Sequence, residues 1–366
     1  MTIPADHVKK ILINCLCFPE TVKELTVSEW ELLIRCARHC KLLAYLRWKL
    51  DSCGLIASVP AQVLTHFTAA QRIVDYRNRL AMWELNRIRR ALYAKDVEVL
   101  VLKGGAYQLL QIPFAQSRLL ADIDILVKKS DIHTVETYLQ QQGWQTAKLD
   151  EYDQQYYRTW MHEVPPLRHQ ERFIEVDLHH TILPLSSRLQ PSPELLIEDS
   201  IAVENTAYKV FSPVDMILHS SVHLFYDAEL NGADFRDLVD LKELIFYFQP
   251  QQEFFFEILL DRAKQLTLQR PLYYTLYFIH NLLDTPIPEE YIEKNIGKPS
   301  WLTRKLMCYL VPLALIPEHP DFPRKKVALA RWLLYVRSHF LRMPFYLLIP
   351  HLLRKSRMRM AGKEMH

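Results

Sequence analysis

Apolar residues recur at helical spacing through the first ninety or so residues of the chain. Ser28-Glu-Trp-Glu31 sets a hydroxyl side chain three positions before a glutamate, which is the signature of a capping box at a helix start. The apolar positions that follow are mostly three or four residues apart and predict one buried helix face: Leu32, Leu33, Cys36, Cys40 and Leu43. A longer helix is predicted from about residue 60 to residue 94.

The long predicted helix carries many arginines, namely Arg72, Arg77, Arg79, Arg87, Arg89 and Arg90. We interpret them as a solvated helix face. The alternative is that some of them lie beside a phosphate-binding site, because the guanidinium group matches phosphate oxygens well.

The pattern changes to that of strands after this helix. Val97-Glu-Val-Leu-Val-Leu102 is apolar and β-branched, which predicts a buried strand. A short helix over Ala106–Gln111 and a second strand over Asp122–Val127 are predicted next. The remaining elements expected here are a helix from Ser130 to about Gly143 and strands that begin at Trp144 and Arg172. This alternation of strands and helices predicts a small α/β or α+β unit.

Helical patterns return at Ser212, which suits the N-cap position and precedes Pro213 and Asp215. A further helix is predicted over Phe235–Phe248. The predicted fold class is therefore α+β, with a small mixed β-sheet core between helical N- and C-terminal regions. We assign an N-terminal helical region to residues 1–94, the α/β core to 95–210, a C-terminal helical region to 211–320 and a basic amphipathic tail to 321–366.

Composition sets only broad limits on function. The chain has 366 residues, of which 49% are apolar and 24% charged, as in an ordinary globular protein of two or three packed units. The net charge of +3 is too small to indicate nucleic-acid binding from the whole-chain balance. Met1–His7 is polar and does not begin a secretory signal, so we expect a cytoplasmic protein.

Five of the six cysteines lie in the first 53 residues, and Cys36-x-x-His39-Cys40 resembles part of a metal cluster. A second ligand pair at zinc-finger spacing is missing from the sequence, and these residues fall within a helical apolar pattern. We therefore expect buried structural thiols, with a zinc site as the alternative.

Two aspartates one residue apart are the main chemical signal. Residues i and i+2 of a strand project from the same face, so Asp122 and Asp124 point at one spot. The two carboxylates repel each other unless a cation lies between them, and their oxygens suit Mg²⁺ or Mn²⁺. Gly104-Gly105, upstream, offers backbone N–H groups for phosphates. The combination indicates a metal-dependent site for a nucleoside triphosphate.

A third carboxylate, Asp177, lies in the apolar run Val176-Asp177-Leu178, where an unpaired charge is costly to bury. We expect the three aspartates to converge if their strands are neighbours. In a two-metal arrangement the ions bind the phosphates, and one aspartate serves as the general base. Asp177 is the natural candidate for that base.

Taken together, these segments resemble the polymerase-β-like nucleotidyltransferase superfamily: Leu102-Lys-Gly-Gly105, Asp122-Ile-Asp124 and Val176-Asp177-Leu178. A narrower resemblance is to the bacterial family of uncharacterised nucleotidyltransferases. It is carried by Val101-Leu-Lys-Gly104, by Arg118 shortly before Asp122-Ile-Asp-Ile-Leu-Val127, and by Val176-Asp-Leu-His179. It covers roughly residues 25–290.

The resemblance implies a role for each matching residue. Asp122 and Asp124 would bind the metals, and Asp177 would be the third ligand and help to deprotonate the acceptor. Gly104 and Gly105 would hold the triphosphate. His179 also matches the narrower family, but the resemblance gives it no role.

Other charged residues leave alternatives open. Lys103 and Arg118 each fit either a phosphate contact or an ion pair at the surface. Among Asp234, Arg236, Asp237 and Asp240 we favour salt bridges within one helix over a place in the cleft. His219 and His223 lie four residues apart, and we favour packed or cleft-lining imidazoles over metal ligands.

The C-terminal part of the chain has a different character. From Arg324 to Lys363 there are eleven Lys or Arg residues and no Asp or Glu, interleaved with aromatic and aliphatic residues. Such a segment suits an anionic membrane surface or an acidic partner. The alternative is a terminal helix that packs on the helical region and has a basic outer face.

The predicted function is transfer of a nucleoside monophosphate from a nucleoside triphosphate, with ATP as the favoured donor, to an acceptor hydroxyl. The acceptor can be a small molecule, a protein or an RNA. Two other hypotheses remain open: a toxin-type enzyme that modifies tRNA, and a non-catalytic nucleotide-binding or scaffold protein of a biosynthetic cluster.

Overall fold

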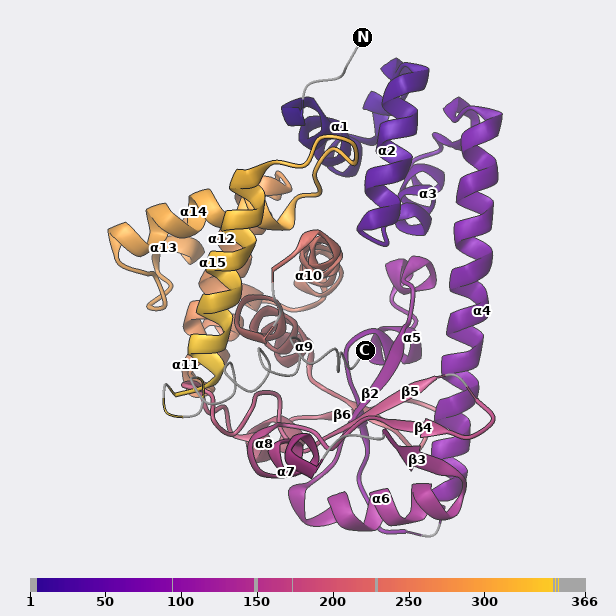
Figure 1. Cartoon of the computed structure of the whole chain (residues 1–366), viewed down its shortest axis with the longest axis vertical. Coiled ribbons are helices and arrows are strands. Elements are labelled where there is room, and N and C mark those ends of the chain that lie inside the picture. Colours follow the sequence, from indigo (N-terminus) through magenta and orange to yellow (C-terminus); the bar gives the residue numbers. More distant parts are fainter. Residues whose placement is uncertain are drawn as a thin grey trace.

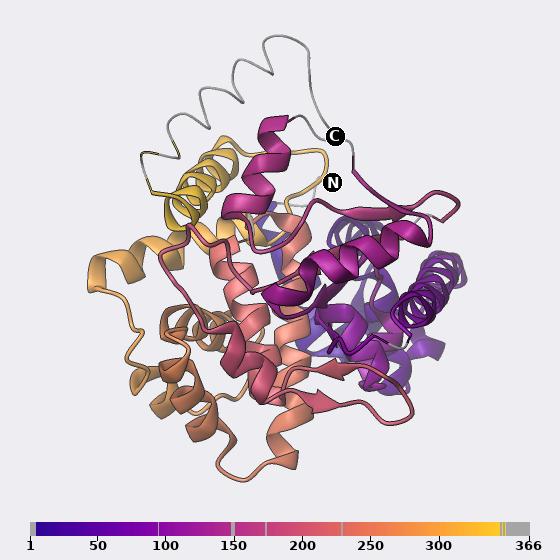
Figure 2. The ribbon, with the colours of Figure 1, turned by 90° about the horizontal axis from the view of Figure 1, so that it is seen from below.

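The computed structural model describes residues 5–93, 95–147, 151–172, 174–227, 230–344, 346 and 348. A mixed seven-stranded sheet lies between two groups of helices, the N-terminal group and the C-terminal group (Figures 1 and 2). This arrangement confirms the predicted α+β class. The residue boundaries that we assigned to the regions stay a prediction.

The N-terminal helices are α1 (Ala5–Cys17), α2 (Val27–His39), α3 (Leu43–Ser52) and α4 (Ala61–Ala91). The capping box predicted at Ser28 is wrong, because the cap residue of α2 is Thr26. Glu29 N donates to the Thr26 hydroxyl over 3.3 Å, and the Glu29 carboxylate accepts from Thr26 N over 2.9 Å. The same spacing of hydroxyl and glutamate occurs twice in this segment, and the earlier pair starts the helix two residues sooner.

The strands are β1 (Leu100–Val101), β2 (Asp122–Leu126), β3 (Trp144–Thr146), β4 (Leu167–His169), β5 (Glu175–His179), β6 (Ile201–Ala202) and β7 (Lys209–Val210). Their order in the sheet is β3-β4-β5-β2-β1-β7-β6. The central strand β2 runs parallel to β5 and antiparallel to β1. Both central strands are buried by apolar side chains such as Ile123, Ile125, Val176 and Leu178.

Four helices belong to this part of the chain: α5 (Lys103–Leu109), α6 (Ile132–Gln141), α7 (Glu151–Trp160) and α8 (Pro193–Glu198). The strand predicted over Val97–Leu102 is shorter than expected, and α5 begins at Lys103 rather than at Ala106. Gly104 and Gly105 therefore lie in the first turn of α5, not in a turn before it. A Cβ on Gly105 would lie 2.7 Å from Val101 Cγ1, so glycine lets the helix start directly against β1.

The C-terminal helices are α9 (Pro213–Val222), α10 (Phe235–Phe248), α11 (Phe255–Gln265), α12 (Gln269–Leu282), α13 (Glu289–Glu293), α14 (Trp301–Leu315) and α15 (Lys325–Arg342). The predicted cap of α9 is confirmed, because the Ser212 hydroxyl accepts a hydrogen bond from Asp215 N. The predicted span of α10 is also confirmed. No helix in the described residues has the combination of length and apolar character that a bilayer-crossing segment needs.

The six cysteines are all free thiols. Cys15, Cys36 and Cys40 are buried, as predicted, and burial raises the pKa of the Cys36 thiol to about 11. The prediction is wrong for Cys53, which is exposed. The only His, Cys, Asp and Glu group that the described residues bring within metal-binding reach contains no cysteine.

A buried ion pair fixes α11 to the start of α9. Asp215 is fully buried, and its two carboxylate oxygens accept hydrogen bonds from Arg262 at 2.8 and 2.9 Å. Replacing Asp215 by Asn removes the buried carboxylate charge and leaves the Arg262 guanidinium with the more exposed Asp199, 2.8 Å away. We expect the free energy of unfolding to fall by about 3 kcal/mol in urea titrations. Glu290→Gln, in the exposed Glu290–Lys294 pair, is the control and should change it by under about 0.5 kcal/mol.

Candidate active site

The pairing of β2 with β5 brings the three predicted aspartates together. In this parallel register Asp124 lies opposite Asp177, and Asp122 lies opposite Glu175. Neighbouring strands are about 4.8 Å apart, so the side chains of Asp124 and Asp177 share one face at short range. Asp122 is exposed at the first position of β2, whereas Asp124 is buried. The predicted convergence of the carboxylates is therefore present in the fold.

A cavity of about 390 Å³ contains these carboxylates. All seven residues predicted from the sequence line it: Lys103, Gly104, Gly105, Arg118, Asp122, Asp124 and Asp177. Its wall also includes residues that sequence analysis did not place there, among them Lys41, His162, Glu163, His179, Arg236 and Arg342. The cavity is thus enclosed by the sheet, by α10, by the segment between α2 and α3, and by the end of α15.

Asp124 is held as a carboxylate by two donors. Lys103 Nζ and His179 Nε2 each donate a hydrogen bond of 3.0 Å to the same oxygen, Oδ1. Burial on its own raises the pKa of this carboxyl, but Lys103 and His179 outweigh burial and hold the pKa well below its usual value. Both hydrogen bonds go to Oδ1, which leaves Oδ2 as the oxygen that can face a cation.

Lys103 occupies an unusual backbone position. Its φ angle is +44°, in the left-handed region that non-glycine residues seldom adopt. Such a conformation costs on the order of 1–3 kcal/mol and is found where the surroundings enforce it. Here Leu102 N donates to the backbone carbonyl of Asp124 over 2.9 Å, which fixes the start of α5 beside β2. The strained backbone thereby aims the Lys103 side chain at Asp124.

Asp177 is in the opposite electrostatic situation. Burial, together with repulsion from Asp124 and Asp122, raises the pKa of its carboxyl to about 8. Lys103 lowers this pKa, but by less than burial and the two aspartates raise it. The three carboxylates thus carry more negative charge than Lys103 and His179 compensate.

Arg118 is paired with two acidic residues of α10. Its Nε donates to Asp240 Oδ2 over 2.6 Å, and its Nη2 lies 3.8 Å from Asp237 Oδ1, both on α10. A Cβ on Gly104 would lie 2.1 Å from Arg118 Nη1, so glycine is needed for this approach. The structure therefore shows Arg118 in a buried ion pair, and the predicted contact with phosphate stays a prediction.

The favoured interpretation, salt bridges within one helix, is confirmed for Arg236 and Asp237, which lie 3.5 Å apart, but is wrong for Asp240, whose carboxylate accepts a hydrogen bond from Arg118. The reason is the close approach of Arg118, which comes from a loop 122 positions away in sequence from Asp240. Arg236 and Asp237 line the cavity.

The two histidines His219 and His223 agree with the favoured alternative of packed or cleft-lining imidazoles. His219 is buried against Phe211, and His223 lines the cavity.

His179 and Glu163 extend the network beyond Asp124. His179 Nδ1 lies 3.4 Å from Glu163 Oε2, so the imidazole bridges two carboxylates. The ring of His162 stacks on that of His179 with a centroid distance of 5.2 Å. Ligand atoms of His162, Glu163 and His179 all lie within 4.8 Å of one another and could hold a metal ion.

The position of His179 in the site could have been predicted from the sequence, because His179 lies two positions after Asp177 on the same strand face. His162 and Glu163 lie in an irregular segment without periodic signal.

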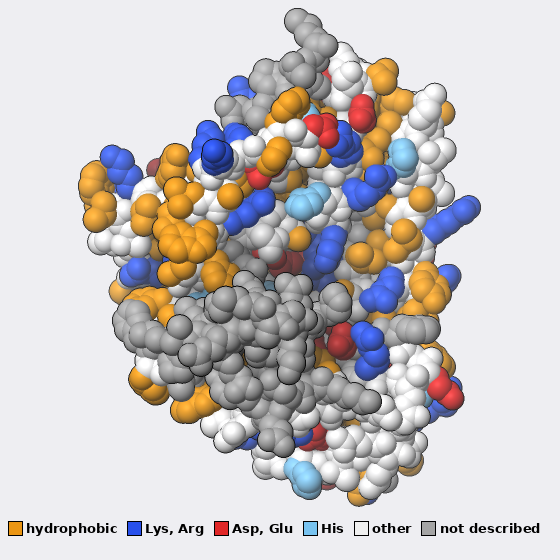
Figure 3. Space-filling model, viewed as in Figure 1, with side chains coloured by type: hydrophobic (Ala, Val, Ile, Leu, Met, Phe, Trp, Pro, Cys, Tyr) orange, Lys and Arg blue, Asp and Glu red, His pale blue; other side chains and the backbone are white. Residues whose placement is uncertain are grey.

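An apolar hollow of about 230 Å³ lies beside the cavity, between α3 and α4. Lys41 lines both, and Leu119, in the wall of the hollow, precedes Leu120 in the wall of the cavity. Its lining includes the basic or ionisable side chains of Arg38 and His66 and the apolar side chains of Ile73 and Val74. Figure 3 shows Lys and Arg side chains gathered on this face, between α15 and the N-terminal helices. The hollow is therefore an apolar extension of the carboxylate cavity with a cationic border.

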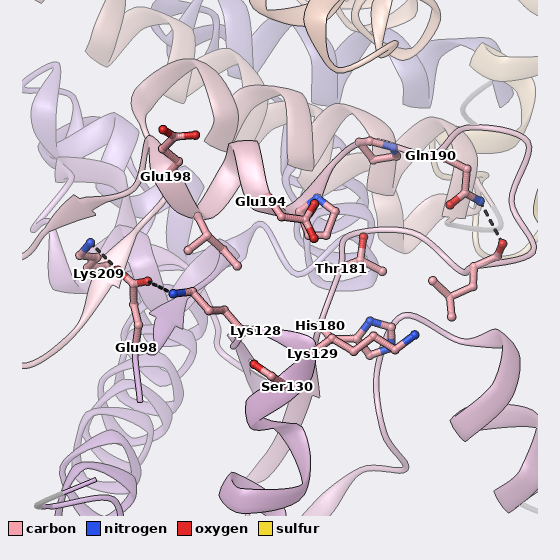
Figure 4. A pocket seen from close by; sticks show the side chains of 14 residues that line it. Glu98, Lys128, Lys129, Ser130, His180, Thr181, Gln190, Glu194, Glu198 and Lys209 are labelled. Carbon is pink, nitrogen blue, oxygen red and sulfur yellow. Dashed lines mark hydrogen bonds and ion pairs between the residues drawn. The ribbon is translucent and has the colours of Figure 1, made fainter. Parts of the chain in front are cut away.

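A larger cavity of about 670 Å³ lies at the other ends of β2 and β5. Figure 4 shows Lys128 and Lys209 on two sides of Glu98, while Glu194 and Glu198 lie on the opposite wall. Its acidic and basic side chains are mixed, and none of the three aspartates lines it. The predicted chemistry therefore belongs to the smaller cavity.

Comparison with known proteins identifies one family. The sequence model of the family described as "uncharacterised nucleotidyltransferase" matches residues 26–284, which is more than half of the chain. This span agrees with the segment of roughly 25–290 over which the motifs resemble that family. No curated protein and no solved structure matches the chain significantly.

The raised pKa of Asp177 predicts a stability effect with a definite sign. Between the unfolded pKa near 4 and the folded value of about 8, unfolding releases a proton that the native state retains, so stability falls as pH rises. Asp177→Asn removes this penalty. In urea titrations with EDTA we expect the variant to exceed wild type by at least about 1 kcal/mol at pH 8, and by much less at pH 5. An equal difference at both pH values would contradict the assigned cause.

Proposed function

The chain belongs to the uncharacterised nucleotidyltransferase family, and we propose that it transfers a nucleoside monophosphate from a nucleoside triphosphate to an acceptor hydroxyl. ATP is the donor that we favour, and pyrophosphate is the other product. The observation that carries the proposal is the convergence of Asp122, Asp124 and Asp177 in one cavity beside Lys103.

The residues present fit a divalent cation. Three carboxylates supply only oxygen ligands, which suits Mg²⁺ or Mn²⁺. The pKa of about 8 at Asp177 indicates an excess of negative charge that a cation would compensate. We propose Asp122, Asp124 and Asp177 as the residues that hold it. When bound, such ions offset charge on the phosphates and orient them for in-line displacement.

Positive groups around the carboxylates support phosphate binding. Lys103 Nζ lies 3.0 Å from Asp124 Oδ1. The same ammonium group can also donate a hydrogen bond to a phosphate oxygen. We propose that the backbone at Gly104 and Gly105 contributes N–H groups at the cavity wall. Arg118 is not a phosphate ligand in this proposal. It is a positioning residue that joins the loop before β2 to α10 through Asp240.

The proton of the acceptor hydroxyl passes to Asp177 in this scheme. The acceptor oxygen forms a bond to the α-phosphorus, and the bond from that phosphorus to the pyrophosphate oxygen breaks. Asp177 is the carboxylate we assign to this transfer because it lies opposite Asp124 in the register of β2 and β5, in the same cavity. His179, held by Glu163, keeps Asp124 in a fixed orientation while the phosphates bind, and is also a positioning residue.

The hollow beside the cavity supports a binding place for the acceptor. Leu119 and Asp122 are three residues apart, so the hollow lies within roughly 11 Å of the aspartate along the chain. Its apolar side chains can pack against the apolar part of a small molecule, and Arg38 and Lys41 can bind an anionic group on that molecule. We therefore favour a small anionic acceptor over a protein or an RNA.

Label transfer tests the main proposal. Wild type is incubated with each α-labelled nucleoside triphosphate, Mg²⁺ and fractions of a cell extract. We expect transfer of label from ATP, and a loss of at least about 100-fold in Asp122→Asn/Asp124→Asn, because these carboxylates hold the donor phosphates.

The matched control is Glu194→Gln/Glu198→Gln, which also removes two carboxylates but from the larger cavity. It should transfer label as wild type does. If wild type binds no nucleotide and labels nothing in any fraction, the enzymatic proposal is wrong.

Charge reversal at the hollow tests the acceptor site. Arg38→Glu and Lys41→Glu should each raise the KM for the active extract fraction about tenfold, because each removes a charge-assisted contact. The Kd for Mg²⁺-ATP, measured by calorimetry, should stay within about twofold of wild type. Arg79→Glu, on the exposed face of α4, is the control for a change of net charge. Weaker ATP binding in the Lys41 variant would assign the hollow to the nucleotide instead.

A further inference from the structure

Helix α15 has two apolar faces, and only one of them is packed. Val327, Ala330, Leu334 and Ser338 are buried where α15 packs on α14 and neighbouring segments. The opposite face is exposed at positions i, i+3, i+4 and i+7: Leu329, Trp332, Leu333 and Val336. A surface helix ordinarily has polar residues on this side. The sequence-based expectation of a terminal helix packed on the helical region is confirmed, but its basic outer face is instead largely apolar.

The adjacent helix α14 adds a second exposed stripe. It consists of Trp301, Leu302, Leu306 and Tyr309, of which Trp301 is 66% and Leu302 70% exposed. The two helices lie side by side. Figure 3 shows hydrophobic side chains gathered over them, with Lys and Arg among and around these side chains. We call these eight residues of α14 and α15 the apolar face.

The concentration of these residues is unusual. Single exposed apolar side chains are normal on any protein surface. Here, eight of the 22 large apolar side chains that are exposed in the described residues lie on two helices of 15 and 18 residues. Such a gathering of exposed apolar side chains on two adjacent helices indicates a site of interaction.

Charge decides which partner fits the apolar face. Neither α14 nor α15 contains an Asp or Glu, while Arg304, Lys305, Lys325 and Lys326 lie on them. Lys305 Nζ lies 4.9 Å above the ring of Trp301, so cation and aromatic ring share one place on the surface.

The two acids between the helices face arginines instead. Asp321 lies 2.6 Å from Arg35, and Glu318 lies 3.7 Å from Arg331. The net charge of α14, α15 and the segment between them is thus positive.

The sequence continues this bias beyond α15. The eleven Lys or Arg residues between Arg324 and Lys363 are not interrupted by a single acid. Part of this segment, namely residues 345, 347 and 349–366, lies outside the described residues. Its composition alone adds positive charge to the same end of the chain.

We propose that the apolar face docks this protein on an anionic lipid surface. Protein–protein interfaces are depleted of lysine at their core, whereas helices that lie in a lipid interface combine Trp and Leu with flanking Lys and Arg. The helices lie along the surface, since neither is long and apolar enough to cross it. The proposal is independent of nucleotidyl transfer.

Docking would also orient the catalytic cavity. Arg342, the last residue of α15, lines that cavity. If α15 lies on the lipid surface, the wall of the cavity that contains Arg342 is held at a fixed position relative to that surface.

Vesicle flotation tests the proposal with the full chain. The probes are vesicles of pure phosphatidylcholine and vesicles in which about a third of the lipid is phosphatidylserine. We expect wild type to float with the anionic vesicles only, and to be released by high salt. Leu329→Ser/Trp332→Ser should bind at least about fivefold more weakly, since it removes two apolar anchors from the exposed face of α15.

The matched control is Ile73→Ser/Tyr76→Ser on α4. It removes one aliphatic and one aromatic side chain at the same i, i+3 spacing, and their exposures of 57% and 53% match those of Leu329 and Trp332. It should bind anionic vesicles as wild type does, and circular dichroism should show both variants folded.

Three outcomes would overturn the proposal. One is that wild type does not float with anionic vesicles. Another is that both double variants lose binding equally. The third is that wild type self-associates in sedimentation velocity and Leu329→Ser/Trp332→Ser does not, which would assign the apolar face to a second copy of this chain.

Discussion

Repulsion among carboxylates at the centre of the sheet is the constraint on which the rest of this structure depends. The parallel register of β2 and β5 sets Asp124 opposite Asp177, and Asp122 lies two residues away on the same face. Lys103 and His179 compensate Asp124, so its pKa is low, but they leave Asp177 with a pKa of about 8. This imbalance lowers the stability of the protein, and it is the basis on which we propose a divalent cation at this place.

The helical regions hold this crowded strand in place. Arg77 of α4 donates from Nε to the carbonyl of Leu120, and from Nη2 to the carbonyl of Ala121, immediately before Asp122. Arg236 of α10 donates to the carbonyl of Leu119 over 3.1 Å. Arg118 then ties the same loop to Asp240. Several cations that look like phosphate ligands in the sequence thus serve the backbone or other acids, because α4 and α10 must be anchored to the sheet.

The same helices link the proposed chemistry to its surroundings. The segment between α2 and α3 reaches the cavity through Lys41, and the end of α15 reaches it through Arg342. Beyond Lys41 lies the apolar hollow with its cationic rim, and along α15 lies the apolar face. The proposed acceptor site and the proposed lipid-binding face are therefore both connected to the cavity, one through Lys41 and the other through Arg342.

The sequence by itself determined the family and the aspartates of the candidate site, because its signals are local. Strand periodicity puts Asp122 and Asp124 on one face, and the motif order with Gly104-Gly105 and Asp177 identifies the family. The register that sets Asp177 opposite Asp124 is a pairing across more than fifty residues, which no local period encodes. Only the tertiary structure decided that Arg118 pairs with α10, that Glu163 meets His179, and that one of two apolar faces of α15 stays exposed. The physical reason is that partners distant in sequence are chosen by packing, and packing depends on the whole fold.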